Sequence, residues 1–228
     1  MTGREKKVIV FIVEGASDEA ALGSILKEYF RSKEISFFVA RGDITTKNGI
    51  TTGNIVKEIN GFVKQLKGKY RYKDSDILEI IHLIDTDGAF VDGSLVRKRK
   101  SKGPVLYYTD HIEANHVGNI IERNSGKAEI LKKLSKTSKI GRIRYSIYYM
   151  SCNLEHVLYG ELREFSIEEK WRLSDEFAEE YEGRADEFAA FLEDEAAVRG
   201  NYKETWEFIE QGAESLRRNT NFHLLFKE

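Results

Sequence analysis

The sequence predicts an α/β protein with a Rossmann-like, mostly parallel central sheet of about four strands flanked by helices. Two observations support this. Short apolar runs rich in β-branched residues alternate with longer segments of helical period up to about residue 160, a pattern typical of parallel sheets covered by helices. Beyond residue 166 only amphipathic helical segments follow, which predicts a helical C-terminal extension.

The apolar runs predict the strands. They are Val8–Val13, Ile35–Ala40, Ile77–Ile84 and Ile143–Met150. Each is short and gives way to an acidic or polar cluster, as expected for a buried strand that ends at a loop. Because parallel strands are joined by right-handed crossovers, their carboxyl ends should meet at one edge of the sheet.

Helical periodicity predicts three helices in this part of the chain: Ser17–Phe30, with Ser17 as N-cap, Asn54–Leu66 and His111–Leu134. An interruption of the third helix at Asn124–Gly126 is an alternative. The later helices are Ser166–Tyr181, Arg184–Val198 and Tyr202–Leu216. We therefore expect an α/β domain over residues 1–162. Residues 163–228 should form an extension packed on it or at a dimer surface. Residues 89–108, with the only proline and a basic run, predict an exposed insertion loop.

Composition restricts the partners and the compartment. The 228 residues are 41% hydrophobic and carry a net charge of -2, so nucleic-acid affinity would have to come from local basic patches or bound cations. Cys152 is the only cysteine, which excludes an internal disulfide and a cysteine zinc cluster. No apolar run approaches the length of a membrane span or a signal sequence. We expect a cytoplasmic protein without a membrane partner.

An acidic residue follows every predicted strand: Glu14, Asp43, the pair Asp85 and Asp87, and Glu155. Gathered at one edge, these carboxylates would repel one another unless a cation neutralised them. Oxygen ligands suit Mg²⁺ or Mn²⁺. The sequence therefore predicts a site for Mg²⁺ (or Mn²⁺), whose proposed ligands are Glu14, Asp18, Asp43, Asp85 and Asp87. For Asp18 and Asp43, capping of the following helix is the alternative.

Basic residues near the acids are candidates for contacts with nucleic-acid phosphates. They are Arg41, Arg97, Lys98, Arg99 and Lys100, for which a solvated face is the ordinary alternative. His156 is a further candidate, as a phosphate contact or proton shuttle beside Glu155. His82, inside the third strand, and Cys152 are expected to serve packing.

Two segments resemble the motifs of Toprim domains. In Val8–Leu22 a hydrophobic strand leads into Glu14-Gly15-x-x-Asp18 and a helix, and in Ile80–Gly88 a strand leads into Asp-x-Asp. The acids at 18, 43 and 155 make the OLD (overcoming lysogenization defect) nuclease the most similar variant. The resemblance implies hydrolysis of DNA or RNA phosphodiesters with two divalent cations. It also implies Glu14, Asp85, Asp87 and Glu155 as catalytic residues.

The sequence departs from that family in two ways. OLD-type nucleases usually carry an ATPase domain, but no GxxxxGK[ST] motif occurs here, so we expect a separate ATPase partner in a defence or DNA-repair system. They also tend to place a Lys close to the late Glu, whereas the nearest basic residues to Glu155 in sequence are Arg142, Arg144 and His156. The main alternative is a non-catalytic Toprim-like module that binds nucleic acid or a partner protein. A phosphatase-like enzyme fits less well, because Glu14 stands where its nucleophilic Asp would be.

Overall fold

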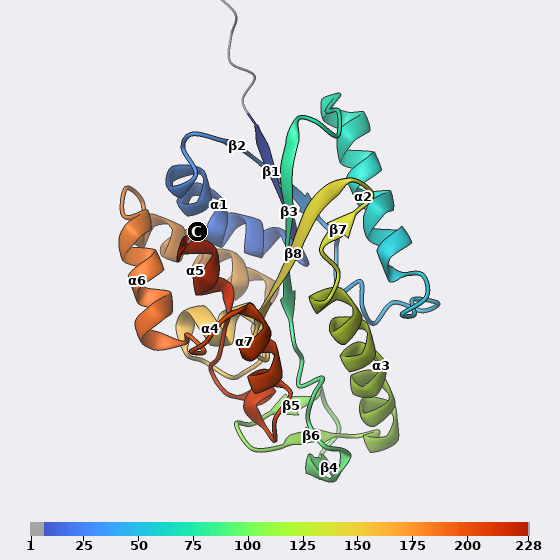
Figure 1. Cartoon of the computed structure of the whole chain (residues 1–228). Coiled ribbons are helices and arrows are strands. Elements are labelled where there is room, and N and C mark those ends of the chain that lie inside the picture. Colours follow the sequence, from blue (N-terminus) through green and yellow to red (C-terminus); the bar gives the residue numbers. More distant parts are fainter. Residues whose placement is uncertain (1–6, 228) are drawn as a thin grey trace, which may run out of the picture.

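Five strands form the central sheet in the order β2-β1-β3-β8-β7 in the computed structural model, which describes residues 7–227 (Figure 1). The strands are β1 (Val8–Val13), β2 (Glu34–Val39), β3 (Ile77–Asp85), β7 (Lys139–Ile140) and β8 (Ile143–Met150). The first three and β8 are parallel, and β7 pairs antiparallel with β8. The predicted α/β class and its four parallel strands are confirmed, and the fold is compatible with a Rossmann-like sheet.

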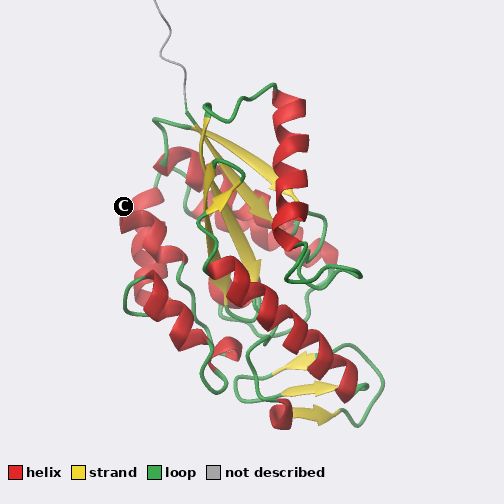
Figure 2. Ribbon diagram, turned by 45° about the vertical axis from the view of Figure 1, so that its right-hand side comes forward, coloured by secondary structure: helices red, strands yellow, loops and turns green. Residues whose placement is uncertain are grey.

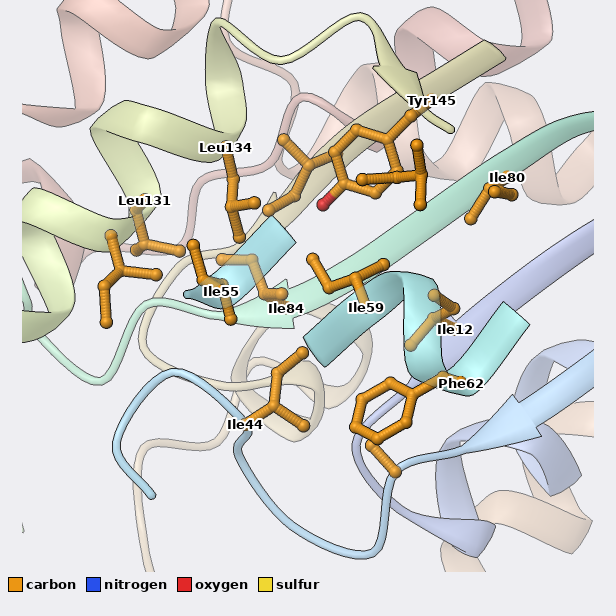
Figure 3. Close-up of a cluster of buried hydrophobic side chains, with 14 of the residues drawn as sticks. Ile12, Ile44, Ile55, Ile59, Phe62, Ile80, Ile84, Leu131, Leu134 and Tyr145 are labelled. Atoms are coloured by element: carbon orange, nitrogen blue, oxygen red, sulfur yellow. The ribbon is translucent and has the colours of Figure 1, made fainter. Parts of the chain in front are cut away.

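The sheet separates two apolar layers, because successive side chains of a strand point to opposite faces. On one face, Val8, Val10 and Ile12 pack with α2 (Ile55–Tyr70), α3 (Val117–Ser135) and α7 (Tyr202–Ile209). Figure 3 shows this cluster, in which strand residues meet Phe62 of α2 and Leu134 of α3.

The other face of the sheet is covered mainly by α1 (Ala16–Tyr29), α4 (Leu154–Tyr159), α5 (Ile167–Glu180) and α6 (Ala185–Glu195). The last 3₁₀ helix, η3 (Phe222–Lys227), joins this layer through Phe222. In Figure 1, α1, α5 and α6 lie on one side of the strands and α2 and α3 on the other.

The C-terminal extension packs on both faces, since α5 and α6 join one layer and α7 the other. It also lines the open side of β8. The N–H of Ser151 donates to the carbonyl of Asn219 (2.9 Å), and the hydroxyl of Thr220 donates to the carbonyl of Tyr149 (2.7 Å). A short 3₁₀ helix, η2 (Glu214–Leu216), precedes this contact.

The expected insertion loop over residues 89–108 is a partly wrong prediction, because these residues supply two strands of a second sheet. After a 3₁₀ turn, η1 (Gly93–Leu95), come β4 (Val96–Lys98), β5 (Leu106–Tyr107) and β6 (Ile112–Ala114), in the order β4-β6-β5. This small sheet lies beyond the carboxyl ends of the parallel strands (Figures 1 and 2). Its own apolar cluster, including buried Val96 and Ile112, holds it together despite the flanking charges.

Two helix starts differ from the prediction. Helix α3 begins at Val117 rather than His111, because Ile112–Ala114 pairs in the small sheet, and it runs unbroken through Asn124–Gly126. In α1 the N-cap is Gly15 rather than Ser17: the Gly15 N–H donates to Asp18 Oδ2 at 2.9 Å. Within the described part of the chain, no helix has both the length and the apolar character needed to cross a lipid bilayer.

Candidate acidic site at the carboxyl edge of the sheet

Six acids from different segments share one site. Glu14 and Asp43 follow β1 and β2, Asp85 ends β3, Asp87 lies two residues on, Glu155 is in α4 and Asp18 is in α1. Burial raises the pKa of Asp85 well above its usual range, and four negative charges raise it further, those of Glu14, Asp87, Asp18 and Glu155. Asp43 also raises the pKa of Glu14. All the acids predicted from the sequence therefore interact.

Lys127 of α3 provides the central positive charge. Its side chain is fully buried (0% exposed), and its Nζ lies 2.9 Å from Asp43 Oδ2 and 2.6 Å from Asp87 Oδ2. Burial alone would lower the pKa of the ammonium, but the charges of Asp87, Asp43 and Glu14 outweigh it and raise that pKa. Lys127 therefore stays charged inside the protein.

Asp43 is held by this ammonium and by its own loop. Thr45 donates to Asp43 Oδ1 with both its backbone N–H (2.7 Å) and its hydroxyl (2.6 Å). Burial opposes ionisation of Asp43, but the charge and hydrogen bond of Lys127, together with the Thr45 hydrogen bonds, lower its pKa to about 2. Asp43 is thus a fixed carboxylate at neutral pH. The predicted alternative role as a helix cap does not describe these contacts.

The pKa of Glu14 shifts in the opposite direction from that of Asp43. Burial raises its pKa to about 8, Asp43 and Asp87 add to the rise, and Lys127 only partly opposes it. The backbone N–H of Asp85 donates to Glu14 Oε1 at 3.2 Å, which orients the carboxyl toward the end of β3. At neutral pH and without a bound cation, Glu14 is therefore mostly protonated.

Asp18 and Glu155 form the other side of the site. Burial raises the pKa of Asp18, and Glu155 contributes to the rise, although the hydrogen bond from Gly15 opposes it. Glu155 is almost fully buried and pairs with Lys170 of α5, with Nζ 2.5 Å from Oε1. Lys170 also interacts with Asp85 and Asp18. It supplies the lysine beside the late Glu that the sequence around Glu155 lacks.

The loop after β3 is fixed by buried polar contacts. Thr86 points away from the acids: its hydroxyl donates to the Ser215 carbonyl (3.0 Å) and accepts from the Cys152 N–H (2.8 Å). Asp87 adopts a left-handed φ of 48°, and Gly88 follows at 69°. A Cβ on Gly88 would lie 2.8 Å from Ile112 Cδ1, so at this left-handed φ any other residue would be strained and would force the Ile112 side chain to shift.

Helix α3 secures the same loop from outside. The side chain of Asn124 donates to the Gly88 carbonyl (3.0 Å), and the guanidinium of Arg123 donates to the Asp87 carbonyl (3.1 Å). Arg123 also donates to the hydroxyl of Tyr107 in β5 (3.0 Å), linking the small sheet to the site. Burial raises the pKa of Tyr107 to about 12. The Asp87 backbone is thereby fixed by α3, which is in turn linked to β5 of the small sheet.

Three site residues were missed from the sequence: Lys127, Lys170 and Arg123. One signal was available for Lys127, because positions 120, 124, 127, 131 and 134 fall on one helical face and Leu131 and Leu134 are buried. A lysine on an apolar face needs a buried partner. For Lys170, in an amphipathic helix with many charges, we find no comparable signal.

The predicted core roles of His82 and Cys152 agree with their burial. His82 Nδ1 lies 2.9 Å from the Tyr145 hydroxyl, and burial lowers the pKa of His82 to about 3. Cys152 is completely buried, and burial raises its thiol pKa well above the usual range. His156, expected to contact phosphate, is only 4% exposed and its Nδ1 has no hydrogen-bond partner among the described residues. In the described conformation its burial does not favour a direct phosphate contact, and the role of His156 as phosphate contact or proton shuttle stays a prediction.

The residues predicted to contact nucleic acid differ in the contacts that their charged groups make within the protein. Arg41, Arg97 and Lys100 are exposed. In contrast, Lys98 Nζ donates to the carbonyl of Asn115 and the guanidinium of Arg99 to that of Pro104, so both brace the small sheet. A hollow of ≈ 710 Å³ is lined by residues 98–105 and by the 114–120 segment.

Two further hollows are lined by lysines that pair with the acids. One of ≈ 600 Å³ lies between the 45–52 loop and α3 and reaches Lys127 and Arg123. The other, of ≈ 330 Å³, is lined by β5, the 162–165 segment, Asn153 and Lys170. The six acids themselves are not among the residues that line these two hollows.

The acids fit a divalent cation in chemistry and charge. Glu14, Asp18 and Asp85 have no ion-pair partner within residues 7–227, and each has a raised pKa, as expected where a positive charge is needed. Carboxylate oxygens are the donors that Mg²⁺ prefers. In the conformation described for these residues, however, no three Asp, Glu, His or Cys side chains are arranged to hold a metal ion. Binding would therefore require side-chain rotations in this group.

Comparisons of the chain with protein-family models, with curated proteins and with solved structures return no match.

Proposed function

We propose that this protein is a divalent-cation-dependent nuclease of Toprim type, which hydrolyses phosphodiester bonds in DNA or RNA. The supporting observation is the meeting of six acids at the carboxyl edge of the parallel sheet, where ligands of open α/β sheets bind. The Toprim-like spacing of Glu14, Asp18, Asp85 and Asp87 supports the same assignment. The substrate and the expected ATPase partner belong to a cytoplasmic defence or repair system in this proposal.

Glu14, Asp18 and Asp85 would hold Mg²⁺ or Mn²⁺, because they are the acids without a basic partner among the described residues. The bound cation would supply charge neutralisation at the phosphate and an activated water. Glu14, whose Oε1 accepts from the Asp85 N–H at the end of β3, would serve as a ligand of the cation or as the group that takes the proton of the attacking water. Lys170, whose side chain is 40% exposed, would meet the phosphate from the solvent side while keeping its contact with Glu155.

The small sheet, which lies beyond the carboxyl ends of the parallel strands (Figure 2), would bind the nucleic-acid backbone through the exposed residues Arg97 and Lys100. Arg41, exposed after β2, would add a contact at the other side. Each lysine or arginine that neutralises a phosphate adds salt-dependent affinity without base specificity. Sequence-independent binding is therefore expected.

The test is a cleavage assay on end-labelled single- and double-stranded DNA and RNA, with Mg²⁺, Mn²⁺ or EDTA. The wild type should cleave at least one substrate with metal and none with EDTA. Asp85→Ala should abolish cleavage. The matched control is Asp194→Ala, an exposed acid on α6, which should cleave like the wild type. Equal cleavage by Asp85→Ala and the wild type would reject the proposal.

A second candidate is a non-catalytic module that binds nucleic acid or a partner protein. It is favoured by Lys127, which already neutralises Asp43 and Asp87, and by the absence of a preformed metal-ligand group in residues 7–227. Under this alternative, the same substrates would be bound in a gel-shift assay and remain intact with either metal. A homodimer, tested by light scattering, is compatible with both candidates.

A further inference from the structure

The six acids divide into two groups by their partners. Asp43 and Asp87 share the ammonium of Lys127, and Glu155 pairs with Lys170. Within residues 7–227, Glu14, Asp18 and Asp85 have no ion-pair partner: the Asp85 N–H donates to Glu14, and the Gly15 N–H and the Ser17 hydroxyl donate to Asp18. The protein therefore places an ammonium in direct contact with one group, whereas Lys127 and Lys170 act on the other only at longer range.

The Asp43–Lys127–Asp87 triad is rigidly built. The Lys127 side chain is 0% exposed, against 13% for Asp43 and 27% for Asp87. Thr45 fixes Asp43 with two hydrogen bonds, and Arg123 and Asn124 fix the backbone around Asp87. To bind a metal ion between Asp43 and Asp87, the protein would have to expel a buried ammonium from two short hydrogen bonds and leave it unpaired, which is strongly unfavourable.

We propose that Lys127 permanently takes the place of one of the two cations expected of a Toprim-type site, so that this protein binds a single divalent ion, through Glu14, Asp18 and Asp85. The proposal rests on the proposed function, because it presupposes a divalent ion. The charges agree with it: in the ionised form that a bound cation favours, the three carboxylates and one divalent ion have a net charge of about −1, whereas a second ion would reverse the sign.

The two acids on either side of Thr86 thus have different roles. Asp85 is a ligand of the single ion, while Asp87 is a partner of Lys127. Asp85→Asn and Asp87→Asn form a matched pair, since each removes one negative charge from the same loop. They distinguish a site with one cation position from a site with two.

The experiment is Mn²⁺ binding by isothermal titration calorimetry and equilibrium dialysis, with circular dichroism as the check on folding. The wild type should bind one specific ion, Asp87→Asn should keep it with less than a tenfold change in Kd, and Asp85→Asn should lose it. Lys127→Gln leaves Asp43 and Asp87 without a cation and should bind two ions.

Each outcome decides a separate point. Two specific ions in the wild type, or equal loss of binding in Asp85→Asn and Asp87→Asn, would overturn the role of Lys127 while leaving the nuclease proposal standing. One ion without cleavage of any substrate would reject the nuclease and retain the inference. No Mn²⁺ binding by the folded wild type would overturn both. Should Lys127→Gln fail to fold, the Asp85→Asn and Asp87→Asn pair still gives the decision.

Discussion

Two carboxylates at adjacent strand ends, Glu14 and Asp43, show how one ammonium divides the site. Lys127 bonds directly to Asp43, whose pKa falls to about 2, whereas Glu14 feels Lys127 only at longer range and its pKa rises to about 8. Burial opposes ionisation of both side chains, and the difference arises from the charge of Lys127 in direct contact with Asp43 and from the hydrogen bonds of Lys127 and Thr45 to it. Folding therefore keeps Asp43 ionised and disfavours the charged form of Glu14.

This asymmetry predicts the pH dependence of Glu14→Gln. A raised pKa means that the stability associated with protonated Glu14 is fully present below pH 4.5 and lost as the pH rises to about 8. Glutamine cannot ionise. In EDTA, the free energy of unfolding of the variant should therefore rise relative to that of the wild type as the pH increases across this interval. We expect about 2 kcal/mol in the free energy of unfolding at pH 8.5 relative to pH 5, after allowing for partial solvent screening.

Urea unfolding at several pH values between 4.5 and 8.5 measures this gain. Glu129→Gln, an exposed glutamate on α3, is the control and should differ from the wild type equally at every pH. A Glu14→Gln difference that stays constant with pH would contradict the assignment of a raised pKa to Glu14.

Lys127 gives a second prediction at this scale. Lys127→Gln removes the cation between two buried carboxylates and should lower the free energy of unfolding in EDTA by about 3 to 5 kcal/mol. Lys132→Gln, five residues after Lys127 on the same helix, breaks a partly exposed pair with Glu210 and should cost less than about 1 kcal/mol. Urea unfolding of both variants at pH 7 tests the contrast, which equal losses would refute.

The sequence revealed the acids but not their counter-ions, for a physical reason. A strand end is marked by an apolar run that stops, so Glu14 and Asp85 could be located from local pattern and from the geometry of parallel sheets. Lys127 and Lys170 reach the site from helices far along the chain, and each stands among other lysines and glutamates. Which of these charges is buried depends on long-range packing.

At the scale of elements, the ends of β3 and β8 are joined by the side chain of Thr86. Thr86→Val keeps the shape but leaves the Ser215 carbonyl and the Cys152 N–H without their partner in a buried position. We expect a loss of about 2 to 4 kcal/mol in the free energy of unfolding, since an unsatisfied buried polar group costs about 1 to 3 kcal/mol. Thermal and urea unfolding measure it. Thr137→Val, whose hydroxyl bonds a carbonyl near the surface, is the control and should change little.

The small sheet gives a prediction about nucleic-acid binding. Arg97→Ala/Lys100→Ala removes two exposed charges from β4 and the turn after it, without touching the bracing contacts of Lys98 and Arg99. If both charges contact phosphates, the slope of log K against log salt should fall in magnitude by about 2. Fluorescence anisotropy with labelled nucleic acid between low and moderate salt measures the slope. The control, Lys64→Ala/Lys133→Ala, removes two exposed lysines from α2 and α3 and should leave the slope unchanged.

The sequence missed this sheet because its strands are only two or three residues long and carry charged neighbours. Val96 and Ile112 alone give no alternating pattern, and the basic run between them is typical of a solvated loop. Their pairing becomes visible only when the cluster with Leu216, more than a hundred residues later, is known.

For the whole molecule, the main result is that the C-terminal extension is part of the sheet domain rather than an addition to it. Residues 163–227 contribute Phe188 and Phe222 to one layer and Trp206 and Ile209 to the other. The same segment contributes the Ser215 carbonyl that holds Thr86. The sequence predicted its helices, but not that Asn219–Asn221 would lie along β8, because these polar residues resemble a loop.

A chain truncated after residue 162 is therefore expected not to fold as an independent domain. Removing the extension would expose the apolar faces that Phe11, Ile81 and Tyr149 now bury, and would open the side of β8 that Asn221 caps at the Tyr149 N–H. The truncated chain should lose its cooperative thermal transition and bind a hydrophobic dye, whereas the full chain should show one sharp transition. Differential scanning calorimetry and dye fluorescence of both chains measure this, with Lys227→Ala in the full chain as the control for changes at the C-terminus. A sharp transition in the truncated chain would mean that the sheet is stable with only α1 to α4, and that the acidic site does not depend on the extension to hold its shape.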